Sequence, residues 1–233
     1  MTYEELQKIS AESGIAINQE TLAKLHLYAH LLAEWNKTMN LTAIDKEDEI
    51  IEKHFYDSII PAKVFDFHKK ALIDVGTGAG FPGLVLAIIF PDLKVTLVDS
   101  TKKKFEFLAE VKSQLSLKNV DFINGRAEEL KQFREKFDVA TARAFSSLDV
   151  IIEVCIPLVK VGGTLIAMKS SKADEEIKSS KIALQKLESK IVEEQRDFLP
   201  SGHDSRVNIF ILKGQKTTPK YPRKWADIVS NPL

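Results

Sequence analysis

The stretch from Ala71 to Gly83, which reads ALIDVGTGAGFPG, constrains the fold of this chain more than any other. Its apolar start is followed by a glycine turn, and Leu84 to Phe90 is apolar again. This order predicts a buried strand, a tight turn and a helix, the opening unit of an α/β nucleotide-type fold. Glycine permits positive φ and close approach of a ligand, and the helix start presents free N–H groups to an anion. The glycines stand at alternate positions: Gly76, Gly78 and Gly80.

The spacing of these glycines separates two kinds of nucleotide site. A dinucleotide fingerprint, G-x-G-x-x-G, would need glycine at position 81, where this chain has Phe81. The pattern Asp74-x-Gly76-x-Gly78-x-Gly80 instead resembles motif I of the S-adenosylmethionine-dependent methyltransferases. A glycine-rich loop is often only a turn, but its place between a strand and a helix favours ligand binding.

Three helices are expected before the first strand. Thr2 and Glu5 have capping-box spacing, Asn18 and Asp45 are N-cap residue types, and Trp35–Asn40 is polar and turn-like. These helices should form an N-terminal cap packed on the α/β body. The expected spans are Thr2–Ser13, Asn18–Trp35 and Asp45–Pro61.

From residue 71 onward, apolar strand patterns alternate with helical patterns, which predicts a parallel sheet with helices on both faces. Expected strands are Ala71–Val75, Lys94–Asp99, Asn119–Asn124, Phe137–Ala142, Thr164–Met168 after a Gly162-Gly163 turn, Lys190–Phe198 and Arg206–Lys213. Expected helices of this part are Leu84–Phe90, Lys102–Leu115, Ala127–Phe133, Leu148–Val159 and Lys172–Leu187. Five βα units closed by a strand pair resemble the Rossmann-like, seven-stranded sheet of class I methyltransferases. We therefore expect a helical cap (1–65), a methyltransferase α/β domain (66–213) and a basic, irregular tail (214–233).

Composition excludes few functions. The 233 residues can bury one substantial core, and Lys+Arg and Asp+Glu both number 33, so net charge neither favours nor disfavours nucleic acid. The sole cysteine, Cys155, lies in an apolar run and is interpreted as a buried residue. Glu4 and Glu5 occupy the N-terminus, without a signal-like apolar core, and no run could span a bilayer. We expect a soluble cytoplasmic protein.

Polar residues at the carboxyl ends of the expected strands are candidate ligand contacts. Asp99 ends the second strand, where an acid accepts hydrogen bonds from ribose hydroxyls; the alternative is a helix cap for the segment at Thr101. Asp74 is expected to accept loop N–H bonds behind the site. Glu128 follows the third strand near the adenine end, or else is a first-turn helix acid. Arg143 follows the fourth strand and needs an acidic, carboxylate or phosphate partner.

Motifs that are missing from the sequence restrict the kinds of methyl acceptor and the types of catalysis to consider. Amino-group methyltransferases of adenine or cytosine carry D/N-P-P-Y after the fourth strand, where this chain has Ala142 to Phe145 (ARAF). Cys155 is misplaced for carbon methylation, and no His or Cys cluster has metal spacing. His54 and His203 are expected to be structural or, at most, to contact substrate. An acceptor atom with a free lone pair, such as a ring nitrogen, needs no general base. Alignment of that atom with the sulfonium methyl group would then supply most of the rate enhancement.

Basic residues gather near the C-terminus. Five positive charges occur without one acid, interrupted by prolines and a tyrosine, and Lys102–Lys104 and Lys169–Lys172 add others near the expected ligand edge. A solvated face is the usual meaning of such a run, but this tail favours contact with an RNA backbone. The five are Lys213, Lys216, Lys220, Arg223 and Lys224.

Nearly the whole chain resembles the bacterial glucose-inhibited division protein B family, the guanine-N7 methyltransferases of small-subunit ribosomal RNA. The resembling segments are WNKTMNLTAI (Trp35–Ile44), HFYDS (His54–Ser58), DVGTGAGFPG (Asp74–Gly83), LVDS (Leu97–Ser100), RAEE (Arg126–Glu129), ARAF (Ala142–Phe145), YPRK (Tyr221–Lys224) and the closing NPL. After YPRK, the WADIVSNPL ending departs from the glycine- or lysine-containing link expected in the family.

The resemblance implies S-adenosylmethionine as cofactor and small-subunit ribosomal RNA, naked or in the 30S particle, as substrate, with no membrane and no obligate protein partner. It implies cofactor contacts at Gly76, Phe81, Asp99, Ser100, Thr101, Ala127, Glu128 and Arg143, to which the turn adds Gly78. Arg143 is the candidate for orienting the reactants, Lys220, Arg223 and Lys224 are the candidates for RNA, and no metal is expected. One alternative is methylation of another RNA or of a small molecule. Two others are a non-catalytic regulator that binds nucleotides or RNA and a nicotinamide dehydrogenase, which Phe81 disfavours.

Overall fold

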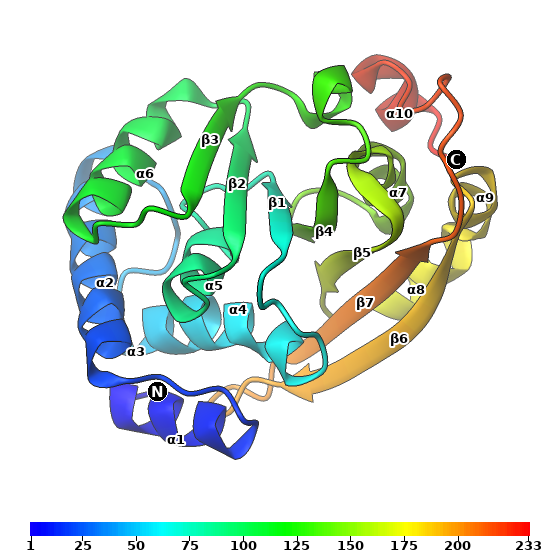
Figure 1. The fold of residues 1–233 in the computed structure, drawn as a ribbon. Coiled ribbons are helices and arrows are strands. Elements are labelled where there is room, and N and C mark those ends of the chain that lie inside the picture. Colours follow the sequence, from blue (N-terminus) through cyan, green and yellow to red (C-terminus); the bar gives the residue numbers. More distant parts are fainter.

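A single seven-stranded sheet forms the centre of the computed structural model, which describes residues 1–233 (Figure 1). The strand order is β3-β2-β1-β4-β5-β7-β6; β1 to β5 are parallel, and β7 is antiparallel to β5 and β6. The predicted seven-stranded class I methyltransferase architecture is confirmed. The strands are β1 (Ala71–Val75), β2 (Lys94–Asp99), β3 (Val120–Asn124), β4 (Phe137–Arg143), β5 (Val159–Lys169), β6 (Ser189–Phe198) and β7 (Ser205–Lys213).

Alternate residues of the strands enter different cores on the two faces of the sheet. In β1, Leu72 joins the core on one face, whereas Ile73 and Val75 join the core on the other. The N-terminal helices, α5 and α6 cover the first face, and α7 to α10 cover the second. The helices of the body are α5 (Gly83–Ile89), α6 (Lys102–Gln114), α7 (Leu148–Cys155), α8 (Ala173–Ser179), α9 (Lys181–Lys186) and α10 (Trp225–Ser230). None of them is both long and apolar enough to cross a membrane.

The first two helices begin where their capping residues predict. Thr2 and Glu5 form a complete capping box at α1 (Tyr3–Glu12), and the Asn18 side chain caps α2 (Gln19–Met39). However, α2 continues through the segment expected to be a turn and ends at Asn40, which is left-handed at φ 48°. Lys37 and Thr38 of this segment are exposed, and the half-buried Asn36 exchanges two hydrogen bonds with the backbone of Thr42, so the polar residues do not interrupt the helix.

The third helical region is less regular than expected, and it begins and ends two residues later. It comprises α3 (Glu47–Ile50), a π-helical turn (Ile51–Tyr56, here the π segment), α4 (Asp57–Ile59) and a 3₁₀ turn (Ile60–Lys63). Its N-cap residue is Lys46, without a side-chain cap bond, so the expectation of an Asp45 cap was wrong. Pro61 lies inside the 3₁₀ turn instead of ending the helix before it.

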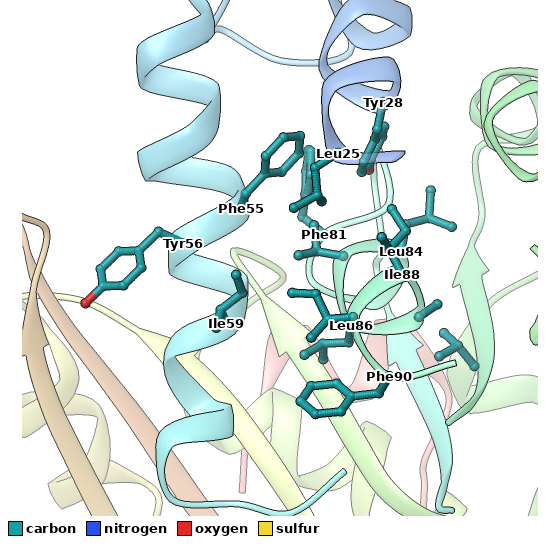
Figure 2. Close-up of a cluster of buried hydrophobic side chains, with 14 of the residues drawn as sticks. Leu25, Tyr28, Phe55, Tyr56, Ile59, Phe81, Leu84, Leu86, Ile88 and Phe90 are labelled. Carbon is teal, nitrogen blue, oxygen red and sulfur yellow. The ribbon is translucent and has the colours of Figure 1, made fainter. Parts of the chain in front are cut away.

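Aromatic side chains join the N-terminal helices to the body in one continuous core (Figure 2). The Tyr28 ring of α2 stacks on Phe55 of the π segment and on Phe81 of the glycine turn, with centroids 5.5 and 5.4 Å apart. The Tyr28 hydroxyl also donates a hydrogen bond to the carbonyl of Ala79, 2.6 Å away. The cap and the glycine turn therefore hold one another in place.

Three other segments differ from the sequence-based expectation. Ala127–Phe133 forms two short 3₁₀ turns rather than one helix, and Lys172–Leu187 is divided into α8 and α9 at the buried Ser180. Gly162 and Gly163, expected as a turn, lie within the long strand β5. A Cβ on Gly163 would lie 2.7 Å from the carbonyl oxygen of Asp138, so the strand needs glycine there.

The C-terminal segment was expected to be irregular, but it contains α10. This helix lies near the end of the sheet to which the arrowheads of β2 and β3 point (Figure 1). In α10, Ile228 is fully buried in the core on the second face of the sheet, so it fixes the helix to the body.

Candidate active site

A buried carboxylate supports the glycine turn from below. Asp74, at 0% exposure, accepts hydrogen bonds from the hydroxyls of Thr77 and Thr141 at 2.6 and 2.8 Å and from the N–H of Gly83 at 3.1 Å. Burial raises the pKa of Asp74, and these hydrogen bonds oppose that rise. Asp74 therefore holds the loop in shape from behind, and the expectation that it accepts a loop N–H bond is confirmed.

The glycines of the turn have different roles. A Cβ on Gly80 would lie 2.5 Å from Leu84 Cδ1, and one on Gly83 would lie 2.3 Å from Leu97 Cδ2, so both glycines are required by packing. Gly78, at φ +60°, would place a Cβ in open space, with the nearest atom 4.0 Å away. The backbone at Gly78 therefore leaves room that a ligand could use.

Asp99 links the turn to the start of α6. Its Oδ2 accepts hydrogen bonds from the N–H of Gly78 at 3.0 Å and from Lys104 Nζ at 3.1 Å, and its Oδ1 accepts one from the N–H of Thr101 at 2.9 Å. Thr101, not Asp99, is the N-cap residue of α6, and no side chain caps this helix, so the helix-capping alternative is not realised. The carboxylate of Asp99 faces a cavity. Since Oδ1 accepts a single hydrogen bond, it retains capacity for another donor.

A cavity of about 350 Å³ opens where the carboxyl ends of β1, β2, β3 and β4 meet; after the cofactor that the sequence leads us to expect there, we call it the cofactor cavity. Its walls come from the glycine turn, the loop after β2, the 3₁₀ turn after β3, the loop after β4 and α10. Six of the residues that sequence reasoning selected lie together in its lining: Gly76, Asp99, Ser100, Thr101, Ala127 and Glu128.

Three other selected residues lie outside this cavity. The N–H of Gly78 donates a hydrogen bond to Asp99, and Gly78 thereby helps to position this lining residue. Phe81 is 5% exposed and belongs to the core, where its ring stacks on His54 with centroids 4.3 Å apart. The guanidinium carbon of Arg143 lies 5.1 Å from the centre of the Phe81 ring, on the side of a second cavity.

The cofactor cavity also has lining residues that sequence reasoning did not select, among them Lys104, Arg126 and Trp225. The guanidinium carbon of Arg126 lies 4.6 Å from the centre of the Trp225 ring, and the centroid of Phe145 is 5.9 Å from that of Trp225. The only sequence signal for Trp225 was its helical spacing from the apolar Ile228. That signal says nothing of where the tail packs.

The second cavity, of about 380 Å³, adjoins the first at Ala144, whose backbone is left-handed at φ 50°. We call it the cationic pocket, because four cationic side chains and only two carboxylates line it. The cations are Lys53, Arg143, Lys169 and Arg206, and the carboxylates are Asp57 and Glu176.

One buried carboxylate organises the cationic pocket. Asp57, 4% exposed, receives Arg143 Nη1 at 3.1 Å on one oxygen and Arg206 Nε at 3.0 Å on the other. Arg143 also donates a hydrogen bond to the carbonyl of Lys53 at 3.2 Å. The partner that Arg143 needs is therefore a side chain of this protein, and Asp57 ties the N-terminal helices to both β4 and β7.

His54 lies between these groups and is kept neutral. Its Nε2 is 2.9 Å from the hydroxyl of Thr42, and its Nδ1 is 3.2 Å from Arg143 Nη2. Burial, and then the positive charge of Arg143, lower the pKa of His54 from 6.5 to about 3. The imidazolium form of His54 is thereby excluded at neutral pH, so His54 has no second proton to give to a substrate there.

The predicted RNA-binding residues of the tail divide into two groups. Lys220 and Lys224 are exposed. Arg223 instead donates to both oxygens of the buried Glu153, at 2.8 Å from Nε and 2.5 Å from Nη2, and so anchors the tail to α7. Lys213, grouped with them by sequence, is fully buried and lies 3.1 Å from Glu135. Charge runs alone could not distinguish these cases.

Comparisons with known proteins agree on one family. Residues 21–200 match the model of the GidB family, described as rRNA small subunit methyltransferase G. A protein named ribosomal RNA small subunit methyltransferase G from Ligilactobacillus salivarius (strain UCC118) is 41% identical over all of both chains. One of the same name from Exiguobacterium sibiricum is 46% identical over 96% of this chain and 95% of the relative.

Among solved structures, M. jannaschii TYW2 in complex with AdoMet superimposes with a TM-score of 0.58 over 73% of this chain and 79% of that chain. Its sequence is only 13% identical, so this likeness concerns the fold alone. The family model and the full-length relatives carry the assignment: this chain belongs to the GidB family of rRNA small subunit methyltransferases.

Proposed function

We propose that this protein transfers the methyl group of S-adenosylmethionine to N7 of a guanine in small-subunit ribosomal RNA. The observation that carries the proposal is the junction of the cofactor cavity with the cationic pocket at Ala144. A small-molecule site and a site for a polyanion thus share one wall. Family membership supports the reaction class and the RNA substrate.

The residues of the cofactor cavity fit an adenosine-containing cofactor. A volume of about 350 Å³ is within the range of small-molecule sites. Oδ1 of Asp99 keeps an acceptor site that would suit a ribose hydroxyl, and the backbone at Gly78 leaves free space beside it. We infer that Asp99, Ser100, Thr101, Ala127 and Glu128 hold the nucleoside.

S-adenosylmethionine, when bound, supplies an electrophilic methyl group on a positively charged sulfur. N7 of guanine carries a free lone pair, so the chain need not remove a proton from the acceptor. The groups of the cationic pocket agree with this, because the pKa of about 3 makes His54 a weak base and Asp57 and Glu176 are paired with cations. The contribution of the chain is then to bind, orient and exclude water.

The cationic pocket is suited to the RNA. Two positive charges in excess of the carboxylates favour phosphate groups, and Arg143 stands at the boundary with the cofactor cavity. Asp57, the carbonyl of Lys53 and His54 together occupy three N–H groups of the Arg143 guanidinium, and its two remaining N–H groups would reach the acceptor nucleotide. We assign to Arg143 the orientation of the target base and its phosphate.

Transfer of a labelled methyl group tests the proposal. The protein is incubated with methyl-labelled S-adenosylmethionine and either naked 16S ribosomal RNA or 30S particles, and the product nucleosides are separated by mass spectrometry. We expect 7-methylguanosine from at least one substrate and more than tenfold less from Arg143→Gln, with Lys118→Gln as an exposed control. Label in another nucleoside would refute the N7 assignment, and cofactor binding without transfer would favour a regulator.

A further inference from the structure

The C-terminal segment places an aromatic ring in the wall of the cofactor cavity. Trp225 is the first residue of α10 and lines the cavity together with Asp99, Ala127 and Phe145. It reaches this position from outside the α/β body, since 11 residues of chain separate it from the last strand, which ends at Lys213. Nothing in the strand-and-helix order of the fold requires a residue from this segment at that place.

Two arginines fasten the segment across the body. Arg134, after the second 3₁₀ turn, donates hydrogen bonds to the carbonyls of Tyr221 at 2.7 Å and Thr218 at 2.9 Å. Arg223 forms its ion pair with Glu153, which is 1% exposed. These tethers lie just before Trp225 in the sequence, so they fix the position of the indole over the cavity.

We infer that residues 214–230 form a strap across the cofactor cavity and that Trp225 is a cofactor-binding residue, contacting the planar base of the bound nucleoside. The inference rests on the proposed function, because it needs an adenosine-containing ligand in this cavity. Trp225 and Phe145 are two aromatic rings in one cavity wall, and aromatic faces bind nucleobases by stacking. The guanidinium of Arg126 packs against the same indole.

The chain offers a spectroscopic test, because it contains only two tryptophans. Trp35 packs against Phe107 in the other core and does not line the cavity, so Trp35→Phe leaves Trp225 as the sole indole reporter. Titration of this variant with S-adenosylhomocysteine should change its emission saturably, with the dissociation constant that calorimetry gives for the same variant. Calorimetric binding with unchanged emission would overturn the assignment.

Substitutions at Trp225 separate a binding role from a merely structural one. Trp225→Ala should weaken S-adenosylhomocysteine binding about tenfold, and Trp225→Phe should restore most of the affinity. Val229→Ala, at an exposed position of the same helix, should match the unmodified protein. Equal affinity in the alanine and unmodified proteins would overturn the inference, and a loss confined to RNA binding would assign Trp225 to the RNA instead.

Release of the strap provides an independent measurement. Arg223→Ala removes the tether while keeping the indole, and it should increase acrylamide quenching of Trp225 and weaken S-adenosylhomocysteine binding severalfold. Unchanged quenching and affinity would contradict the strap. Absence of any cofactor binding by the unmodified protein would refute the cofactor cavity itself, an outcome distinct from failure of the strap alone.

Discussion

Acidification from pH 7 to pH 5 is expected to destabilise the fold through His54. The imidazole is buried against Phe81, and its pKa falls from 6.5 to about 3. In the unfolded chain the pKa returns to about 6.5. Between these two values the unfolded chain takes up a proton that the folded chain does not. Stability that is present above pH 6.5 is therefore lost as the pH falls.

The magnitude follows from the linkage relation. At pH 5 the medium is about one and a half pH units below the unfolded pKa, which corresponds to a loss of about 2 kcal/mol, whereas at pH 7 the loss is only about 0.2 kcal/mol. The folded imidazole is still neutral at pH 5, so the pKa of the unfolded chain alone sets this figure. A change of about 2 kcal/mol is a substantial part of the stability of a typical domain.

Urea unfolding at pH 7 and pH 5 measures the effect in the unmodified protein and in His54→Gln. The unmodified protein should lose about 2 kcal/mol more between the two pH values than the variant, because glutamine cannot take up the proton. His30→Gln, at an exposed position of α2, should retain the pH dependence of the unmodified protein. An identical pH dependence in His54→Gln and the unmodified protein would show that His54 is not held neutral by the fold.

Three further substitutions test the site and its support. Asp99→Ala should weaken S-adenosylhomocysteine binding by about 1–3 kcal/mol in calorimetry, because a hydrogen-bonding carboxylate leaves the cavity. Gly83→Ala should lower the free energy of unfolding in urea by about 1–3 kcal/mol, since its Cβ would lie 2.3 Å from Leu97 Cδ2. Replacing both Lys220 and Lys224 with glutamine should reduce the salt dependence of RNA binding, measured by filter retention, by a slope of about 1–2.

Each of these has a matched control. Asp121→Ala changes an exposed acid of β3 and should leave cofactor affinity unaltered, and Lys118→Gln should leave the salt slope unaltered. Gly202→Ala adds a methyl group with no atom nearer than 3.6 Å and should cost little stability. A full-affinity Asp99→Ala, a fully stable Gly83→Ala, or an unchanged salt slope would each contradict the role given to that residue.

Sequence reasoning located β1 and β2 best, because each is a largely apolar run that a polar or glycine-rich turn follows. The bounds of β1 and β2 agree with the expectation to the residue. The turn between β1 and α5 was equally clear, since glycine at alternate positions after a strand is the local pattern of a turn with positive φ. Where the physical cause is local, a single sequence is sufficient.

Other features depend on partners that are distant in the sequence. Arg143 pairs with Asp57, 86 residues earlier, and Arg223 pairs with Glu153, 70 residues earlier. The sequence shows that a buried charged residue needs a partner, but it does not show which residue that partner is. For the same reason Lys213 could not be recognised as buried, because its environment is made by Glu135 and the carbonyl of Val159.

The sequence predicted those parts of the cofactor cavity that the ends of the sheet strands form. Residues at or just after the ends of β2 and β3 lie where parallel topology requires, so Asp99 and Ala127 line the same cavity, as expected. Trp225 was missed because the path of a proline-containing tail across the surface has no periodic signal. Phe81 was assigned to the cofactor through the family resemblance, whereas its side chain fills the core beneath His54.

Because of the π segment, the number of residues in this helical region matters as much as their identity. A π turn holds one more residue than an α-helical turn, and the wider turn sets the direction of every side chain that follows. Here it aims Phe55 into the core while His54 and Asp57 both reach Arg143. Removing one residue would rotate the subsequent positions by about 100° and separate these partners, even with every remaining amino acid unchanged. Insertions and deletions should therefore be tolerated less at Ile51–Tyr56 than conservative replacements are.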